Sequence, residues 1–195
     1  GVDLSTLDHV SPLVVLPRAY DYLNDGDLVV LAPDQQKIRV IYRRASKQNY
    51  FLTTERCNHY CLMCSQPPKE IDDDWLIDEI RHAIPLIDPA TEELGFTGGE
   101  PTLLGDRFID VLKACKSHLP NTVLHVLSNG RRFSDFAFSQ SWAEIAHPDL
   151  MVGIPVYSDI SSIHDYVVQA DGAFDETIRG ILNLKKLEQR VEIRV

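Results

Sequence analysis

Short apolar runs alternate with helical apolar stripes along most of the chain from about Asn49 onward. The runs have the length of strands and are rich in β-branched and aromatic residues. They comprise Tyr50–Thr54, Leu94–Thr97, Val123–Ser128, Leu150–Tyr157 and Val191–Val195. Strands that alternate with helices indicate a parallel sheet with right-handed crossovers, either flat or closing toward a barrel.

The segments between these runs carry apolar residues at helical spacing. The positions are Leu76, Ile80, Ala83, Ile84 and Ile87; Phe108, Val111, Leu112 and Cys115; and Phe174, Ile178, Ile181 and Leu182. Asp72–Asp74 precede the first stripe and predict a solvated, acidic helix start. Ser134 is a candidate cap for a further, shorter helix. Cys115 lies on an apolar stripe, so we expect it in the core.

The first 48 residues differ from the rest. Leu28–Ala32 and Ile38–Tyr42 predict two strands, and Pro33–Gln36 between them predicts a hairpin turn. We therefore expect an N-terminal β-rich element over residues 1–48 and an α/β core over 49–195. The sequence begins with Gly1 and stops directly after an apolar-alternating run, so we also expect a fragment whose C-terminal part is missing.

Composition narrows the possible partners and the compartment. With 29 acidic and 19 basic residues the net charge is −10, which argues against nucleic acid or an anionic membrane as the main partner. The sequence shows no secretory signal, and no apolar run approaches the roughly 18 residues of a membrane helix. Three of the four cysteines lie within eight positions, which favours a cytoplasmic metal site over a disulfide framework.

The cysteine cluster has the spacing C-x3-C-x2-C, formed by Cys57, Cys61 and Cys64 directly after the first core strand. Three thiolates so close together can hold three irons of a cubane cluster and leave the fourth iron without a protein ligand. Zinc is the alternative, but structural zinc takes four ligands, usually in two pairs. His59 lies inside the first cysteine spacer, and we expect it to be a loop residue.

Further candidate residues follow the next strands. Gly98-Gly99-Glu100-Pro101 combines glycines that allow close backbone approach with a carboxylate acceptor. Asn129 follows the third strand and Ser158 follows the fourth. Each segment alone would read as an ordinary turn. Together they fall at the carboxyl ends of successive parallel strands, where α/β folds assemble active sites, so the sequence predicts one site.

The cysteine spacing together with Gly-Gly-Glu-Pro resembles the radical S-adenosylmethionine (SAM) superfamily, over about residues 49–195. The resemblance implies an α/β fold, a partial (β/α)6 TIM-like barrel that this chain does not complete. It also implies a 4Fe–4S cluster on the three cysteines, with SAM chelating the open iron. The implied SAM contacts are Gly98, Gly99 and Glu100 to the methionine amino group, Asn129 and Ser158 to the ribose, Arg194 to the carboxylate, and Met63 to the adenine, where many members carry an aromatic residue.

A narrower resemblance, to the His-Xaa-Ser system radical SAM maturases (HxsC type), rests on Leu52–Asn58 and Cys61–Lys69. The superfamily resemblance implies reductive cleavage of SAM with an electron from an external donor, and the narrower one implies a ribosomal precursor peptide as substrate. Two alternatives remain open at this point. One is a radical SAM enzyme acting on a small metabolite, and the other is a non-catalytic iron–sulfur or zinc module.

Overall fold

Five parallel strands form the central sheet of the computed structural model, which describes residues 16–32 and 37–195. The strands are β3 (Gln48–Leu52), β4 (Glu93–Thr97), β5 (Val123–Leu127), β6 (Leu150–Pro155) and β7 (Arg190–Arg194). They lie side by side in chain order, β3-β4-β5-β6-β7. A doubly wound sheet reverses its strand order at a switch point, whereas this sheet never does. The prediction of an α/β, partial TIM-like barrel is confirmed.

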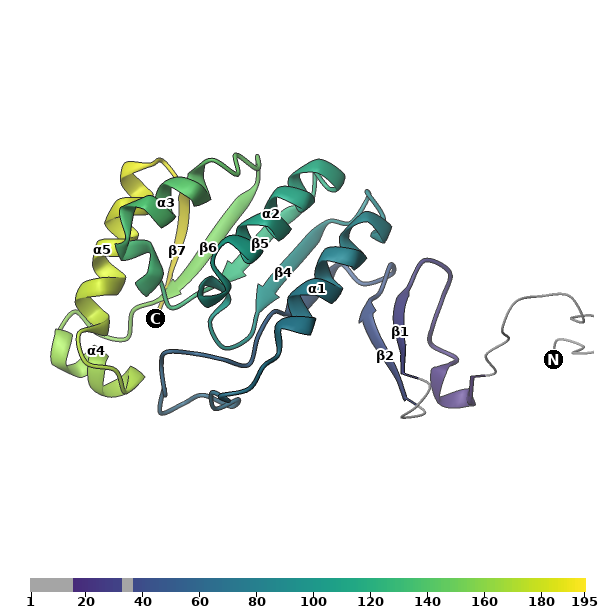
Figure 1. The fold of residues 1–195 in the computed structure, drawn as a ribbon, viewed down its shortest axis with the longest axis horizontal. Helices are drawn as coiled ribbons and strands as arrows, with labels where there is room; N and C mark the ends of the chain where they lie inside the picture. Colours follow the sequence, from purple (N-terminus) through teal and green to yellow (C-terminus); the bar gives the residue numbers. More distant parts are fainter. Residues whose placement is uncertain (1–15, 33–36) are drawn as a thin grey trace, which may run out of the picture.

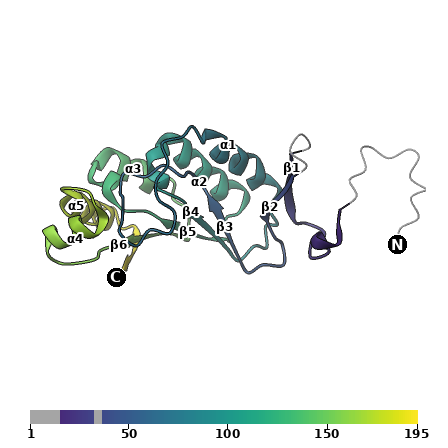
Figure 2. The same cartoon turned by 90° about the horizontal axis from the view of Figure 1, so that it is seen from below.

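Helices connect the strands: α1 (Asp74–Ala83), α2 (Asp106–His118), α3 (Phe136–Ala143), α4 (Ser161–Val168) and α5 (Ala173–Lys186). Short 3₁₀ turns add Arg18–Tyr20, Ile84–Leu86, Pro101–Leu104 and Arg131–Ser134. Figure 2 shows α1, α2 and α3 on the same side of the strands. The cap of α3 is Asp135, which accepts a hydrogen bond from the Ala137 amide, rather than Ser134. Within the described residues, no helix is both long and apolar enough to span a bilayer.

The core lies between the sheet and these helices. Alternate strand residues, such as Phe51, Phe96 and Val126, are buried on that face. Phe96 contacts Phe108 of α2 edge to face, with 5.7 Å between ring centroids, and Phe108 lies 6.4 Å from Trp142 of α3. Cys115 is completely buried in the same cluster, as its position on the helical stripe predicts.

The opposite face of the sheet carries polar side chains lying over glycines. A Cβ atom at Gly95 would come within 2.1 Å of the Tyr50 ring, and one at Gly153 within 3.0 Å of His125 Nε2. His125 Nε2 reaches across Gly153 to lie 3.2 Å from Glu192 Oε2 on β7. This face runs up to the strand ends where the candidate site is predicted.

The N-terminal element is an antiparallel pair, β1 (Leu28–Ala32) and β2 (Lys37–Tyr42). Figure 1 shows it at the end of the sheet away from α4 and α5. A buried hydrogen bond of 2.7 Å joins the Tyr42 hydroxyl to Thr91 Oγ1, and Arg39 pairs with Glu79 of α1 at 2.5 Å. The predicted turn at Pro33–Gln36 lies outside the described residues.

Candidate functional site

A cavity of about 380 Å³ opens at the carboxyl ends of the parallel strands. Every strand of the sheet, or the loop that follows it, contributes to its wall. The lining includes Cys57, Cys61 and Cys64 after β3; Gly98 and Gly99 after β4; Ser128 and Asn129 after β5; Pro155 and Tyr157 at the end of β6; and Arg194 of β7. The structure thus brings together most of the residues that the sequence singles out.

The three motif cysteines are free thiols facing this one cavity. Burial raises the pKa of Cys57 to about 11; a hydrogen bond from the His59 amide lowers it, and the charges of Glu100, Cys61 and Cys64 raise it further. Burial, and then the charge of Cys64, raise the pKa of Cys61 as well. Thiolates are the forms that bind metals, and here they would repel one another. Iron cations would remove this cost, so the donor set fits a cluster.

A single-ion site does not fit the same residues. Among residues 16–32 and 37–195, no three His, Cys, Asp or Glu side chains converge on one ion position. His59 is buried, and its Nδ1 lies 3.9 Å from Cys61 Sγ. The described side chains therefore do not offer the four converging ligands of structural zinc. In a cubane cluster, by contrast, each cysteine binds a different iron.

The cysteine loop is held from outside by α4 and by the loop after β5. The Tyr60 and Leu62 amides donate to the carbonyls of Val168 and Val167 at the end of α4, each at 3.0 Å. Asn58 Oδ1 accepts from Asn129 Nδ2 at 2.6 Å, and the Asn58 carbonyl accepts from Arg131 Nη1 at 2.9 Å. The loop therefore has a defined position without help from sheet hydrogen bonds.

The two glycines of Gly98-Gly99-Glu100-Pro101 are in close backbone contact with the residues at the start of the cysteine loop. The Gly99 amide donates to the Thr54 carbonyl at 2.7 Å, and the Glu100 amide to the Arg56 carbonyl at 2.8 Å. Gly98 has φ +142°, and a Cβ there would lie 2.3 Å from the Thr54 oxygen. At Gly99 it would lie 2.1 Å from the Arg56 oxygen. Both positions require glycine because backbone meets backbone.

Glu100 points away from the cavity into the protein. Its side chain is only 1% exposed, and its carboxylate accepts from Thr102 N (3.0 Å) and Oγ1 (2.6 Å), Ser128 Oγ (2.8 Å) and Asn129 N (2.6 Å). Burial raises the pKa of Glu100, and these hydrogen bonds oppose the increase. Glu100 therefore ties the loop after β4 to the loop after β5. A contact of Glu100 with a methionine amino group stays a prediction.

The remaining predicted SAM contacts do not all line this cavity. Asn129 and Arg194 line the cavity, and Arg194 Nη1 also lies 3.6 Å from Glu192 Oε2. Met63 is 53% exposed and lies outside the lining. Ser158 borders a neighbouring cavity, and its Oγ accepts from the Ile160 amide at 3.0 Å before α4. Tyr157 also lines the cavity. This role is not predicted, although its place as the last residue of the fourth predicted run, at the carboxyl edge of the sheet, would have been the signal.

An incomplete α/β barrel whose strand ends gather three cysteines and a glycine-rich segment defines a class of cluster-binding enzyme. The family model "Radical SAM superfamily" matches residues 51–194, and the chain belongs to this superfamily. The superfamily uses a 4Fe–4S cluster and SAM. Cys57, Cys61 and Cys64, the free thiols that share the cavity, are the residues that would hold the cluster.

Several solved structures share this fold. One is "native anSMEcpe with bound AdoMet", with TM-score 0.55 and 19% identity over 74% of this chain and 42% of that chain. The structure of the same protein with bound AdoMet and the Cp18Cys peptide has a TM-score of 0.53 and 20% identity, over 74% of this chain and 41% of that chain. The structure of methylornithine synthase (PylB) has a TM-score of 0.56 and 15% identity, over 75% of this chain and 43% of that chain. The chain thus spans less than half of these proteins, and no curated protein matches it. The narrower His-Xaa-Ser resemblance gains no support and stays a prediction.

Proposed function

We propose that this chain is the catalytic core of a radical SAM enzyme that modifies a ribosomally made precursor peptide. When bound, the cluster and SAM supply the electron and the 5′-deoxyadenosyl radical that removes a hydrogen atom from the substrate. The observation that carries the proposal is the shared cavity, into which the three cysteines and the glycine-rich segment both open.

The residues of the chain divide the work. The three cysteines hold the cluster, while Gly98 and Gly99 form part of the cavity wall without side chains. Arg194 supplies a positive charge for a carboxylate, from the strand farthest from the cysteine loop. Asn129 presents a side-chain amide from the middle of the sheet. Binding and orientation at this edge are the protein's contribution, with the electron arriving from an external donor.

Two observations support a peptide substrate. One similar structure holds AdoMet together with a peptide, and the residues flanking the motif cysteines resemble those of peptide maturases. A small metabolite is the second candidate, because methylornithine synthase resembles the fold equally well. These two candidates share the cofactor chemistry and differ only in what enters the barrel.

The test has two stages. Anaerobically reconstituted protein should contain about four irons per chain, and after reduction it should release methionine and 5′-deoxyadenosine from SAM. A protein that holds iron and releases neither product would be a non-catalytic module. The second stage offers a peptide containing His-Xaa-Ser repeats and a matched peptide with the histidines changed to alanine. Mass spectrometry should show a changed mass only for the first; two unchanged peptides would count against a His-Xaa-Ser substrate and leave the SAM chemistry standing.

A further inference from the structure

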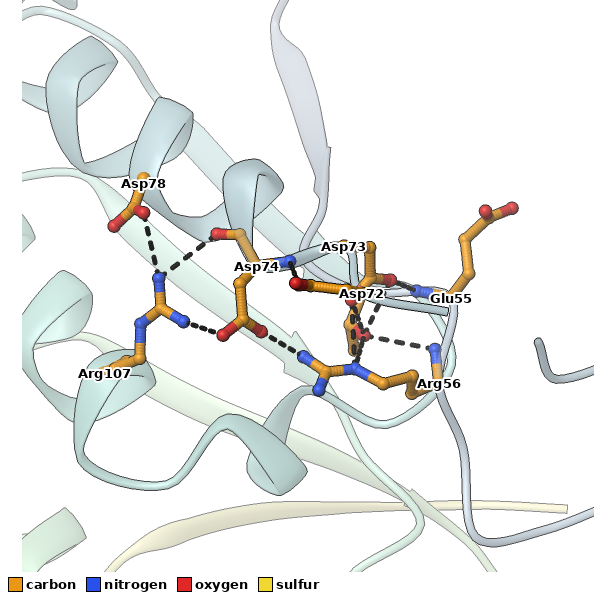
Figure 3. A network of polar contacts seen from close by, with 8 residues as sticks. Glu55, Arg56, Asp72, Asp73, Asp74, Asp78 and Arg107 are labelled. Carbon is orange, nitrogen blue, oxygen red and sulfur yellow. Dashed lines mark hydrogen bonds and ion pairs between the residues drawn. The ribbon is translucent and has the colours of Figure 1, made fainter. Parts of the chain in front are cut away.

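Three consecutive aspartates, Asp72–Asp74, lie at the start of α1, and the middle one is turned into the protein (Figure 3). Asp72 is exposed, as expected of a solvated helix start, but Asp73 is 1% exposed. The prediction of a wholly solvated acidic start is therefore wrong at Asp73. Asp73 occupies the N-cap position of α1, yet its side chain makes no capping hydrogen bond to the helix. Its carboxylate must serve another purpose.

In the described part of the chain, the partners of the Asp73 carboxylate all belong to the three residues directly before Cys57. Thr54 Oγ1 donates to the carboxylate at 2.9–3.0 Å and the Glu55 amide donates at 2.5 Å. Arg56 Nε lies 3.0 Å from Asp73 Oδ1 and forms an ion pair with it. Buried, charge-assisted hydrogen bonds of this kind are among the strong ones in proteins. We call Thr54, Glu55 and Arg56 the stem of the cysteine loop.

Arg56 extends this contact to two helices. Its Nη2 donates to Asp74 Oδ1 at 2.5 Å, and Asp74 also pairs with Arg107 of α2. Arg107 Nη2 lies 3.0 Å from Asp78 Oδ2, one turn further along α1. Figure 3 shows the two arginines approaching Asp74 from opposite sides. The stem is thus fixed to α1 and α2, which pack in the core.

The stem is also hydrogen-bonded to the glycine-rich segment. The carbonyls of Thr54 and Arg56 accept from the amides of Gly99 and Glu100. A Cβ at Gly99 would also lie 3.1 Å from Cys57 Cβ, so the segment and the first cysteine are in direct contact. A shift of the stem would therefore move Cys57 and the glycine-rich segment together.

We propose that Asp73 is a positioning residue, whose buried carboxylate sets Cys57 and the Gly98–Glu100 segment in the arrangement that binds cluster and SAM. The inference rests on the proposed function, since it assigns a role toward the same two cofactors. Asp73 touches neither the cavity nor any reacting group. It acts through the three stem residues.

The test compares two neighbouring aspartates. Asp73→Asn keeps the size of the side chain but replaces one accepting oxygen by an amide N–H group. This donor would then face the donor groups of Thr54, Glu55 and Arg56. Asp72→Asn is the matched control, because among residues 16–32 and 37–195 the Asp72 carboxylate accepts only from the Asp74 amide, at 3.2 Å. The readouts are iron per chain, the rate of iron loss to a ferrous chelator, and the SAM dissociation constant from the electron paramagnetic resonance spectrum of the reduced cluster.

We expect Asp73→Asn to bind SAM about tenfold more weakly and to lose iron about tenfold faster, as loss of a hydrogen bond to a charged group implies. Asp72→Asn should match the unmodified chain. Should Asp73→Asn fail to fold, Arg56→Lys takes its place, because a lysine cannot span Asp73 and Asp74 and residue 56 is partly exposed. Arg56→Lys should weaken SAM binding in the same direction.

The outcomes separate this inference from the proposed function. If the unmodified chain binds no four-iron cluster, the proposed function fails and the inference falls with it. If the unmodified chain binds cluster and SAM and the folded Asp73→Asn does so equally well, only the positioning role fails. A lowered melting temperature with unchanged iron loss and SAM affinity would show a purely structural carboxylate and overturn the inference. Unchanged SAM affinity in Arg56→Lys would do the same.

Discussion

Gly99→Ala is the substitution whose consequence the structure defines most sharply. The new Cβ would lie 2.1 Å from the Arg56 oxygen and 2.5 Å from the Arg56 carbonyl carbon, both backbone atoms. Since carbon–oxygen contacts normally begin near 3.3 Å, the two segments must separate by about 1 Å. That movement breaks the hydrogen bonds of 2.7 and 2.8 Å that join the glycine-rich segment to Thr54 and Arg56. Misplacement by about 1 Å typically costs about a hundredfold in rate.

We therefore expect Gly99→Ala to cleave SAM about a hundredfold more slowly, with a stability loss of about 1–3 kcal/mol from overpacking. The assay is 5′-deoxyadenosine release under reducing conditions, with thermal melting alongside. Gly105→Ala is the control: its φ of +55° strains alanine, but no atom lies within 4 Å of the new Cβ. It should lose stability and keep the cleavage rate per cluster. A Gly99→Ala protein that cleaves SAM at the unmodified rate would refute the close-contact argument.

Three further predictions concern the cluster, a buried carboxylate and pH. Replacing any one of the three motif cysteines by alanine should abolish the bound cluster, measured as iron per chain. Cys115→Ala should only lower the melting temperature, and cluster loss in this variant would contradict the assignment. Glu100→Gln should keep the cluster, weaken SAM binding about tenfold in calorimetry and cost about 1–3 kcal/mol of stability, because an amide then faces buried donors. An unchanged SAM affinity together with an unchanged stability would show that the charge is dispensable. Slight desolvation raises the pKa of Asp74, but the neighbouring Arg56 and Arg107 lower it overall from its ordinary value of 3.8. The contribution of Asp74 to stability is therefore present above pH 3.8 and is lost as the pH falls through the lowered pKa. The melting-temperature difference between the unmodified chain and Asp74→Asn should accordingly vanish at acid pH, and a difference that persists there would have another origin.

The strands could be predicted because their apolar runs are buried on the helix-facing side and end at turn residues. β4 and β5 differ from the predicted runs by one residue each. Helix α4 is absent from the prediction for a physical reason. The buried residues of α4 are His164 and Val168, whereas the apolar Ile163 and Tyr166 are exposed at 46% and 66%. The inward side therefore carries a polar residue and is not marked by an apolar stripe. The helix instead serves the cysteine loop through its terminal carbonyls.

The positions of the cysteines and glycines at the strand ends could also be predicted, because that edge follows from topology alone. The direction in which side chains turn could not. Asp72 and Asp73 are identical in type and adjacent in sequence, and only the contact of Asp73 with a stem 17 to 19 residues earlier separates them. Glu100 looks in sequence like a ligand of a cofactor, yet its partners Thr102 and Ser128 draw it inward.

Two buried carboxylates explain how irregular loops can be packed at this edge. Loops that leave a sheet carry amide groups that no strand can pair, and burying them unpaired is costly. Asp73 accepts from the Glu55 amide before the cysteine loop, and Glu100 accepts from the Thr102 and Asn129 amides. Each carboxylate therefore satisfies loop donors from the protein side. Because those donors are already paired, the thiols and glycines of the same loops are left facing the cavity, and the helices around the site hold the loops in place.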